Sequence, residues 1–404
     1  MDRCTASTLA LCAAAGAVVA GVATRWLLLL AAPPPPTTKD AADEEEVVVV
    51  DGVTGLIGNT PLVRIASLSA ATGCEVLGKA EFLNPGGSSK DRVALHVIEA
   101  AEAAGQLTPG ACIFEGTSGS TGISLAMVAC ARGYACHIVM PSDQAVEKSQ
   151  LLERYGATVE RVPPCSIVDP GHFVNVARRR AMEATTGGYF VDQFESPLNF
   201  DAHARTTGPE ILRQTRGRVD AFVHGAGTGG TLAGVTWFLK RHAKSSPSSP
   251  SPSVRCYLAD PQGSGLANRV NHGVLFAATE REGTRRRQQV DTLVEGIGLN
   301  RLTRNFARVA PVLDGAISVS DADAVRMARW LMAKDGQFVG SSAAVNCVAA
   351  LSIARSLGPG HTIVTILADS GHRHLTKFWN DDAMARIGHS TAVPESLDEF
   401  AQLL

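Results

Sequence analysis

Apolar and polar positions divide the chain into three stretches. Residues 9–32 are almost all apolar, and Arg25 is their only charge. As a helix they would be about 36 Å long, enough to cross a hydrocarbon core of roughly 30 Å. The stretch therefore predicts an N-terminal membrane anchor over residues 1–32, with a cleaved signal peptide as the alternative. Residues 33–50, rich in proline and then in acidic residues, predict a linker.

From residue 51 onward, short apolar runs alternate with stretches of helical periodicity. Gly, Pro or Asp bounds each apolar run. Alternation of this kind predicts an α/β fold with mainly parallel sheets. We place this main domain at residues 51–385 and a C-terminal tail at 386–404. Its clearest predicted strands are 111–114, 136–140, 221–224, 254–258 and 362–367, and its clearest predicted helices are 91–104, 123–131, 147–155, 232–241 and 322–334.

Composition narrows the class of protein. A chain of 404 residues, 45% of them hydrophobic, can form one large domain or two lobes with a real core. The net charge of -2 gives no indication of a nucleic-acid surface. The nine cysteines include no C-x-x-C pair, which argues against a disulfide framework or structural zinc and favours a reducing compartment. His203, His372 and His374 lack metal-ligand spacing, so no metal is predicted and we expect them at the cleft rim or at helix ends.

A glycine-rich loop follows the predicted strand 221–224. Gly225, Gly227 and Gly230 fit the pattern G-x-G-x-x-G, but the acidic residue that a dinucleotide site requires further on is missing. We interpret the loop as a cradle for one small phosphate, formed by backbone N–H groups and the positive end of helix 232–241. A tight turn without a ligand is the alternative. The residues assigned to this phosphate cradle are Gly227, Thr228, Gly229, Gly230 and Thr231.

Lys90 lies in the turn-forming run 84–92, at the start of a predicted helix. A partly desolvated lysine near the positive end of a helix dipole has a lowered amine pKa, which suits Schiff-base chemistry. Taken alone, a lysine in such a run would most often be an ordinary surface lysine. The neighbouring motifs decide between these interpretations.

Nine segments occur along the chain in one order: 58–62 (GNTPL), 84–92 (NPGGSSKDR), 115–122 (EGTSGSTG), 192–194 (DQF), 206–210 (TTGPE), 227–231 (GTGGT), 295–298 (EGIG), 340–342 (GSS) and 369–371 (DSG). Together they resemble the cysteine synthase and cystathionine β-synthase family of fold-type-II pyridoxal-phosphate (PLP) enzymes. Within that family they resemble the membrane-anchored fungal cysteine synthase 2-like branch. The resemblance covers residues 51–380 and implies a two-lobed, tryptophan synthase β-like α/β fold. We add to it the predicted N-terminal transmembrane helix.

The resemblance also implies roles for individual residues. Lys90 would bind the cofactor, pyridoxal 5′-phosphate, covalently and act as the catalytic residue. Ser341 would contact the pyridine nitrogen, where a hydroxyl favours elimination and replacement at Cβ. Ser120 stands where the family usually has an asparagine that contacts the cofactor's 3′-oxygen. The substrate carboxylate would be bound by Thr117, Ser118, Gly119, Thr121 and Gln193.

The reaction implied is the formation of L-cysteine from O-acetyl-L-serine and sulfide through an α-aminoacrylate. Three alternatives stay open: a cystathionine β-synthase-like activity, a serine or threonine dehydratase, and a weakly active membrane-tethered PLP-binding scaffold. The partners expected are a small amino acid, sulfide or a thiol, a membrane contacted through residues 9–32, and a second copy of the chain in a homodimer. By resemblance to fungal members, we expect attachment to the mitochondrial outer membrane, with the catalytic domain facing the cytosol.

Overall fold

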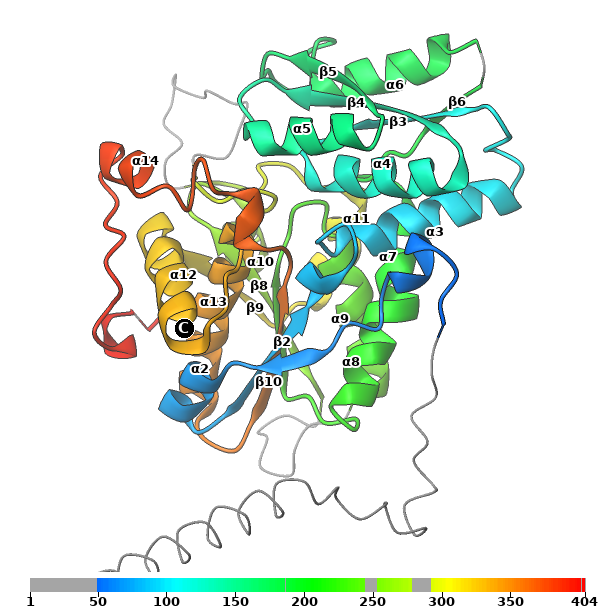
Figure 1. Ribbon diagram of the computed structural model, residues 1–404. Helices are drawn as coiled ribbons and strands as arrows, with labels where there is room; N and C mark the ends of the chain where they lie inside the picture. The colour runs from blue at the N-terminus through cyan, green and yellow to red at the C-terminus, as the bar shows by residue number, and fades with distance from the viewer. Residues whose placement is uncertain (1–48, 186, 244–252, 278–291, 401, 404) are drawn as a thin grey trace, which may run out of the picture. The chain divides into compact units, whose positions relative to one another are not determined.

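The computed structural model describes residues 49–185, 187–243, 253–277, 292–400 and 402–403 (Figure 1). All the described helices and strands belong to one compact unit, Val50–Leu404. The predicted anchor lies outside the described residues. Within the described ranges, no helix has the length and apolar character needed to cross a bilayer. The transmembrane part of the predicted fold therefore has no support.

The smaller lobe is built on a four-stranded parallel sheet in the order β5-β4-β3-β6. Consecutive residues of β4 enter different hydrophobic clusters, Ile138 with α4 and Val139 with α6, so helices cover both faces of the sheet (Figure 1). The elements of this lobe are β3 (Cys112–Gly116), β4 (Ala135–Pro141), β5 (Thr158–Val162), β6 (Gly188–Phe190), α3 (Lys90–Ala103), α4 (Ser120–Arg132), α5 (Val146–Arg154) and α6 (Phe173–Glu183).

The larger lobe is built on a six-stranded sheet in the order β1-β2-β10-β7-β8-β9, in which only β1 is antiparallel. Val223 packs with α12 and α13, whereas its neighbour Phe222 packs with α9 on the opposite face. The strands are β1 (Leu62–Arg64), β2 (Glu75–Ala80), β7 (Ala221–Gly225), β8 (Arg255–Pro261), β9 (Gly315–Val319) and β10 (Thr362–Leu367). The helices are α2 (Ala66–Thr72), α7 (Pro197–Ala202), α8 (Gly208–Gln214), α9 (Gly230–His242), α10 (Leu266–His272), α11 (Arg304–Val309), α12 (Asp321–Asp335), α13 (Ser341–Leu357) and α14 (Asp381–Arg386).

The two-lobed α/β fold predicted from the sequence is confirmed. All five predicted strands are present as β3, β4, β7, β8 and β10, and all five predicted helices as α3, α4, α5, α9 and α12. Helix α13 was not predicted because residues 341–354 are buried on every side, so its sequence has no polar face to mark a helical period. The boundary between the catalytic domain and a tail at 386–404 stays a prediction, and Leu397 and Phe400 of that tail are buried in the same cluster as α12 and α13.

Candidate active site

The carboxyl ends of parallel strands from both sheets meet at one pocket of about 680 Å³. Ligands of open α/β sheets bind outside the carboxyl ends of the strands, and this volume lies in the range of small-molecule sites. The pocket is therefore the candidate active site. The residues that line it at the ends of β3, β4, β7 and β10 are Thr117, Pro141, Gly225 and Ala368.

The structure brings most of the predicted site residues into this one pocket. Gly119, Gly230 and Ser341 are not among the lining residues. Gly119 and Gly230 lie in the two loops that do line it. The predicted residues that line the pocket are Lys90, Thr117, Ser118, Ser120, Thr121, Gln193, Gly227, Thr228, Gly229 and Thr231.

Lys90 is the first residue of α3 and is partly buried in the pocket wall. Burial lowers the pKa of its amine, and the positive charge of Arg373 lowers it further, whereas the carboxylates of Asp369 and Glu81 oppose the shift. Desolvation disfavours the charged ammonium form, and it outweighs the opposing carboxylates here. The Lys90 amine is therefore deprotonated more readily than that of an ordinary lysine, as a nucleophile or base requires.

The turn before Lys90 is fixed by its own polar contacts. The Asp91 carboxylate accepts hydrogen bonds from Gly86 N at 2.6 Å and from Ser124 Oγ at 2.5 Å, and so ties the turn to α4. The Asn84 side chain accepts a hydrogen bond from Gly58 N at 2.8 Å and donates to the Glu81 backbone. Burial raises the pKa of Asp91 to about 6. These contacts hold the Lys90 backbone in place while its side chain faces the pocket.

The loop between β3 and α4 presents the N-terminus of a 13-residue helix to the pocket. Gly119 has φ 143°, a conformation that only glycine adopts readily. The first N–H groups of a helix have no partner within it, so this loop can bind an anion such as a carboxylate. Its residues therefore lie where a carboxylate-binding role requires them.

Gln193 is engaged by protein groups. Its side-chain oxygen accepts a hydrogen bond from Thr121 Oγ1 at 2.5 Å, and its amide nitrogen donates to Glu115 Oε1 and Gly116 O, both at 3.2 Å. Burial raises the pKa of the Glu115 carboxyl to about 8, which keeps it neutral near pH 7. In this arrangement Gln193 orients Thr121, which lines the pocket.

The loop from Gly227 to Thr231 fits a phosphate. A Cβ added to Gly227 would overlap the carbonyl oxygen of Gly296, and one added to Gly230 would overlap the Asn199 side chain. Gly229 has φ 86° and begins α9 as its N-cap. Neighbouring segments pack so closely against the loop that only glycines fit at these positions. A glycine-rich loop before a helix can bind a phosphate through its backbone N–H groups. The residues fit the phosphate of PLP.

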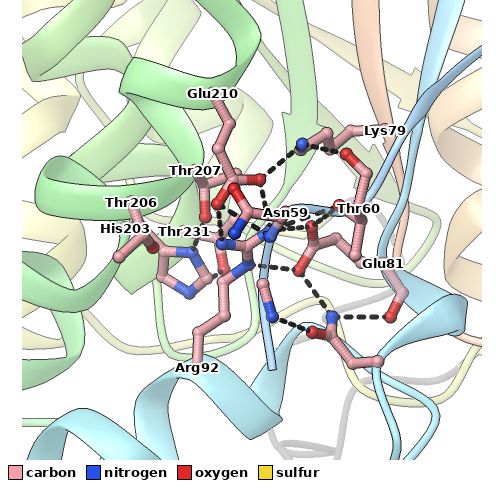
Figure 2. Close-up of polar contacts among 12 residues, drawn as sticks. Asn59, Thr60, Lys79, Glu81, Arg92, His203, Thr206, Thr207, Glu210 and Thr231 are labelled. Atoms are coloured by element: carbon pink, nitrogen blue, oxygen red, sulfur yellow. Dashed lines mark hydrogen bonds and ion pairs between the residues drawn. The ribbon is translucent and has the colours of Figure 1, made fainter. Parts of the chain in front are cut away.

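His203 holds one hydroxyl of this loop. It is fully buried in the segment His203–Thr207, with Nε2 3.0 Å from Thr231 Oγ1 and Nδ1 2.9 Å from Thr207 Oγ1 (Figure 2). Burial lowers the pKa of His203 well below its usual value, and the charges of Lys90 and Arg92 add to this, so the ring is neutral. From the sequence we expected this histidine at the cleft rim or at a helix end. The rim position was wrong, because His203 is fully buried.

Ser341 is the first residue of α13 and is fully buried. Its hydroxyl accepts a hydrogen bond from Glu295 N at 3.1 Å, and it is the neighbouring Ser342 that lines the pocket. The role of Ser341 at the pyridine nitrogen therefore stays a prediction.

A cluster of charged side chains, which we call the rim cluster, lines the pocket where the two lobes meet. It consists of Lys148 of α5 together with Glu295, Asp369 and His374 of the larger lobe. Lys148 pairs with Glu295, and His374 lies 3.3 Å from Glu295 and 3.0 Å from Asp369. Sequence analysis missed this cluster, because three segments far apart in the chain supply its members. No group of residues within the described ranges has the composition of a metal site.

The rim cluster shifts the pKa values of its members in opposite directions. Burial by itself would raise the pKa of Glu295, but the hydrogen bond from His374 and the charge of Lys148 hold it well below its usual value. Burial by itself would lower the pKa of His374, but Asp369 and Glu295 outweigh it and the pKa is raised.

The His374→Asn variant should lose stability in a pH-dependent way. Because the folded pKa of His374 is raised, its charged form stabilises the fold fully below the unfolded value near 6.5, and the effect fades as pH rises through the folded value. The difference in unfolding free energy between wild type and variant should be larger near pH 6 than near pH 9, measured by urea titration. The exposed His272→Asn is the control. An equal difference at both pH values would contradict a charged His374.

The fold and the pocket define the class of protein: a two-lobed α/β unit with a low-pKa lysine beside a glycine-rich phosphate cradle is a pyridoxal-phosphate enzyme. The family model described as pyridoxal-phosphate dependent enzyme matches residues 53–369. The chain is 56% identical over 357 residues to cysteine synthase 2 of Schizosaccharomyces pombe, covering 86% of this chain and 88% of that protein. The chain belongs to the cysteine synthase family, as its ordered motifs predicted.

A solved structure gives the same result for the fold. The crystal structure of the O-acetylserine dependent cystathionine beta-synthase from Helicobacter pylori is 30% identical, with a TM-score of 0.70, and the match covers 82% of this chain and 98% of that one. The match therefore extends over nearly the whole of the solved chain.

The predicted location needs correction. A relative from Saccharomyces cerevisiae, 51% identical over 357 residues (86% of this chain and 88% of that protein), carries a provisional name as a mitochondrial cysteine synthase that mentions no membrane. No helix within the described ranges could cross a membrane, and residues 9–32 lie outside them. The prediction of an outer-membrane enzyme facing the cytosol was wrong, because it inferred an anchor from the apolar composition of residues 9–32 alone.

Proposed function

We propose that this protein makes L-cysteine from O-acetyl-L-serine and sulfide, with pyridoxal 5′-phosphate held at Lys90. The observation that carries the proposal is that a lysine of lowered pKa shares one pocket with two helix N-termini, those of α4 and α9. Each N-terminus favours an anion. One suits the cofactor's phosphate and the other suits the carboxylate of an amino acid. The identity to named cysteine synthases over most of the chain supports the same reaction.

The glycine-rich loop would hold the cofactor's phosphate through backbone N–H groups and the hydroxyls of Thr228 and Thr231, and Ser341 would serve the ring nitrogen. Bound PLP supplies an electron sink that acidifies the Cα proton of an amino acid and lets a substituent leave Cβ. The N–H groups and hydroxyls of residues 117–121 would orient the substrate carboxylate, supported by Gln193.

Lys90 would then act as the base. Its unprotonated amine would take the Cα proton, acetate would leave with the Cβ–O bonding pair, and sulfide would form the Cβ–S bond. The Lys90 ammonium would return its proton to Cα. The products are L-cysteine and acetate, so the atoms and charges balance without a further reactant.

The second substrate, which adds to Cβ, distinguishes the proposed reaction from its alternatives. The printed name of the Helicobacter pylori structure describes a cystathionine beta-synthase that depends on O-acetylserine. That name supports O-acetylserine as the donor and makes homocysteine the main alternative acceptor. A dehydratase would stop after loss of the leaving group and release pyruvate. The proposal includes a catalytic domain over residues 51–385 and a C-terminal tail over residues 386–404. It also includes a homodimer, which light scattering of the purified chain would test.

A substrate comparison tests the proposed function. The PLP-loaded chain is mixed with O-acetylserine and sulfide, with O-acetylserine and homocysteine, with serine and homocysteine, and with serine alone, and cysteine, cystathionine and pyruvate are quantified. We expect the highest kcat/KM for the first pair. Cystathionine as the main product, or pyruvate formed at the same rate without a thiol, would overturn the assignment. A protein that binds PLP but turns over none of these pairs would be a scaffold.

A further inference from the structure

Asn199 lies behind the phosphate loop and is bonded to it through one nitrogen atom. Its side chain comes from α7, and Nδ2 donates hydrogen bonds to Thr228 Oγ1 at 2.8 Å and to the backbone oxygen of Gln193 at 2.9 Å. Asn199 is 1% exposed and is not among the residues that line the pocket. It can therefore act on a ligand only through the residues that it holds.

The contacts of Asn199 allow its amide only one orientation. A backbone carbonyl oxygen only accepts hydrogen bonds, so the nitrogen of the Asn199 amide, and not its oxygen, must face Gln193 O. The Asn199 Oδ1 is buried without a hydrogen-bond partner among the described residues, and the side chain packs directly against Gly230. A buried oxygen left unpaired is costly, which argues that the two contacts of Nδ2 serve the site.

The direction of these hydrogen bonds decides what the Thr228 hydroxyl can do. An amide nitrogen only donates, so Thr228 Oγ1 accepts from Asn199, and it also accepts from Gly230 N at 3.4 Å. Both lone pairs of the oxygen are then occupied, and only its proton is left to bond. Thr303 Oγ1 donates to the backbone oxygen of Thr228 at 2.7 Å and so holds the residue in place. Since Thr228 lines the pocket, its hydroxyl is available there as a donor to an anion.

We infer that Asn199 is a positioning residue for the cofactor's phosphate: its amide, oriented by the Gln193 backbone oxygen, turns the proton of the Thr228 hydroxyl toward that phosphate. The inference rests on the proposed function for the presence of PLP. Because linked hydrogen bonds polarise one another, the amide also strengthens Thr228 as a donor. Without the amide, the hydroxyl can rotate its proton away from the phosphate. The loop then keeps its backbone N–H groups but loses one directed donor.

The test compares full-length variants that keep or remove the Thr228 hydroxyl. Asn199→Ala is made in the wild-type chain, in Thr228→Val, which keeps the shape but lacks the hydroxyl, and in Thr228→Ser, which keeps the hydroxyl. PLP affinity is measured on the apo-proteins, and the phosphorus NMR resonance of bound PLP is recorded. Asn305→Ala is the matched control. Asn305 is also a buried asparagine that donates to Gln193 O, at 3.2 Å, but its other hydrogen bond goes to Phe194 O and not to the phosphate loop.

Loss of one directed donor to a charged group should weaken PLP binding about tenfold and shift the phosphorus resonance. Asn199→Ala and Thr228→Val should show this alike. The double variant should bind PLP within about twofold of Thr228→Val, because both changes remove one interaction. In the Thr228→Ser background, Asn199→Ala should keep its full effect. Asn305→Ala should leave both the PLP affinity and the phosphorus resonance unchanged.

Two results would overturn the inference: an undiminished effect of Asn199→Ala in the Thr228→Val background, or an equal loss of PLP affinity in Asn305→Ala. If Asn199→Ala fails to fold, Asn199→Asp replaces it. The aspartate matches the amide in size, but its carboxylate cannot donate and instead accepts the Thr228 proton. Its effect should shrink in Thr228→Val, and equal losses in both backgrounds overturn the inference as well. The proposed function fails separately, if wild-type protein binds PLP but forms no cysteine.

Discussion

Replacing Lys90 with alanine is expected to lower cysteine formation by about 1,000-fold or more and to abolish the absorption of covalently held PLP. The physical reason is that the Lys90 amine would serve both as the covalent attachment and as the base for the Cα proton. Lys90 lines the pocket, and burial lowers the pKa of its amine. The measurement is the steady-state rate with O-acetylserine and sulfide, together with the absorbance spectrum of the reconstituted protein.

Two further variants separate the amine's chemistry from its charge. Lys90→Arg keeps a positive charge but cannot give up its proton, so it should be as inactive as Lys90→Ala. An added primary amine should restore part of the rate to the alanine variant and none to the arginine variant. The distant Lys240→Ala is the control and should retain full activity. Appreciable cysteine formation by Lys90→Ala without added amine would exclude Lys90 as the base.

Glu210→Ala is expected to lower the free energy of unfolding by about 3–5 kcal/mol. The Glu210 carboxylate accepts hydrogen bonds from Arg92 at 2.6 and 2.8 Å and from Lys79 at 2.6 Å (Figure 2). Arg92 also donates two hydrogen bonds, both 2.8 Å long, to the Glu81 carboxylate. All four side chains are buried. Removing one carboxylate leaves two buried cations with a single negative partner, and desolvation makes that imbalance expensive.

The measurement is urea unfolding of the apo-protein, with Glu99→Ala as the matched control. Glu99 pairs with Arg132 at 3.1 Å, but both side chains are largely accessible, so its loss should cost less than about 1 kcal/mol. A paired replacement, Lys79→Met with Glu210→Gln, should recover part of the lost stability, because it removes one of the excess charges. An unfolding free energy for Glu210→Ala within about 1 kcal/mol of wild type would contradict the account of the network.

The stability of this network matters to the site because its parts are shared. Arg92 lies two residues after Lys90 on the same helix, and Glu210 lies in the first turn of α8, which directly follows the segment that carries His203 and Thr207. The network therefore ties the helix that presents Lys90 to the segment that orients Thr231 (Figure 2). A change at Glu210 should weaken both the lysine's placement and the phosphate loop.

The sequence was most informative where a residue type is required locally. The glycines at 119, 227, 229 and 230 occupy positions where a side chain would either clash or require an unfavourable φ, so these positions require glycine. Strands such as β7 and β10 are continuous apolar runs because both faces of their sheet are covered. These constraints act within a few residues, and they predicted the strands and the phosphate loop. The ordered motifs and the family resemblance that they carry supplied the two lobes and the other pocket residues.

The sequence was least informative where a contact joins distant segments. Its N-terminal apolar stretch led to a wrong location, since hydrophobicity alone does not distinguish an anchor from a leader. The pairs Ser120–Arg373, Lys148–Glu295 and His203–Thr231 join separate elements, and only the packing of those elements decides that the side chains meet.

By itself, then, the sequence determined the α/β fold, the lysine and the glycine-rich loops of a cysteine synthase family member, because each depends on local backbone conformation or on an ordered motif. Only the tertiary structure decided which charges surround that lysine, and only it showed that Arg373 donates a hydrogen bond to Ser120. Desolvation and polar pairing depend on which distant segments pack together.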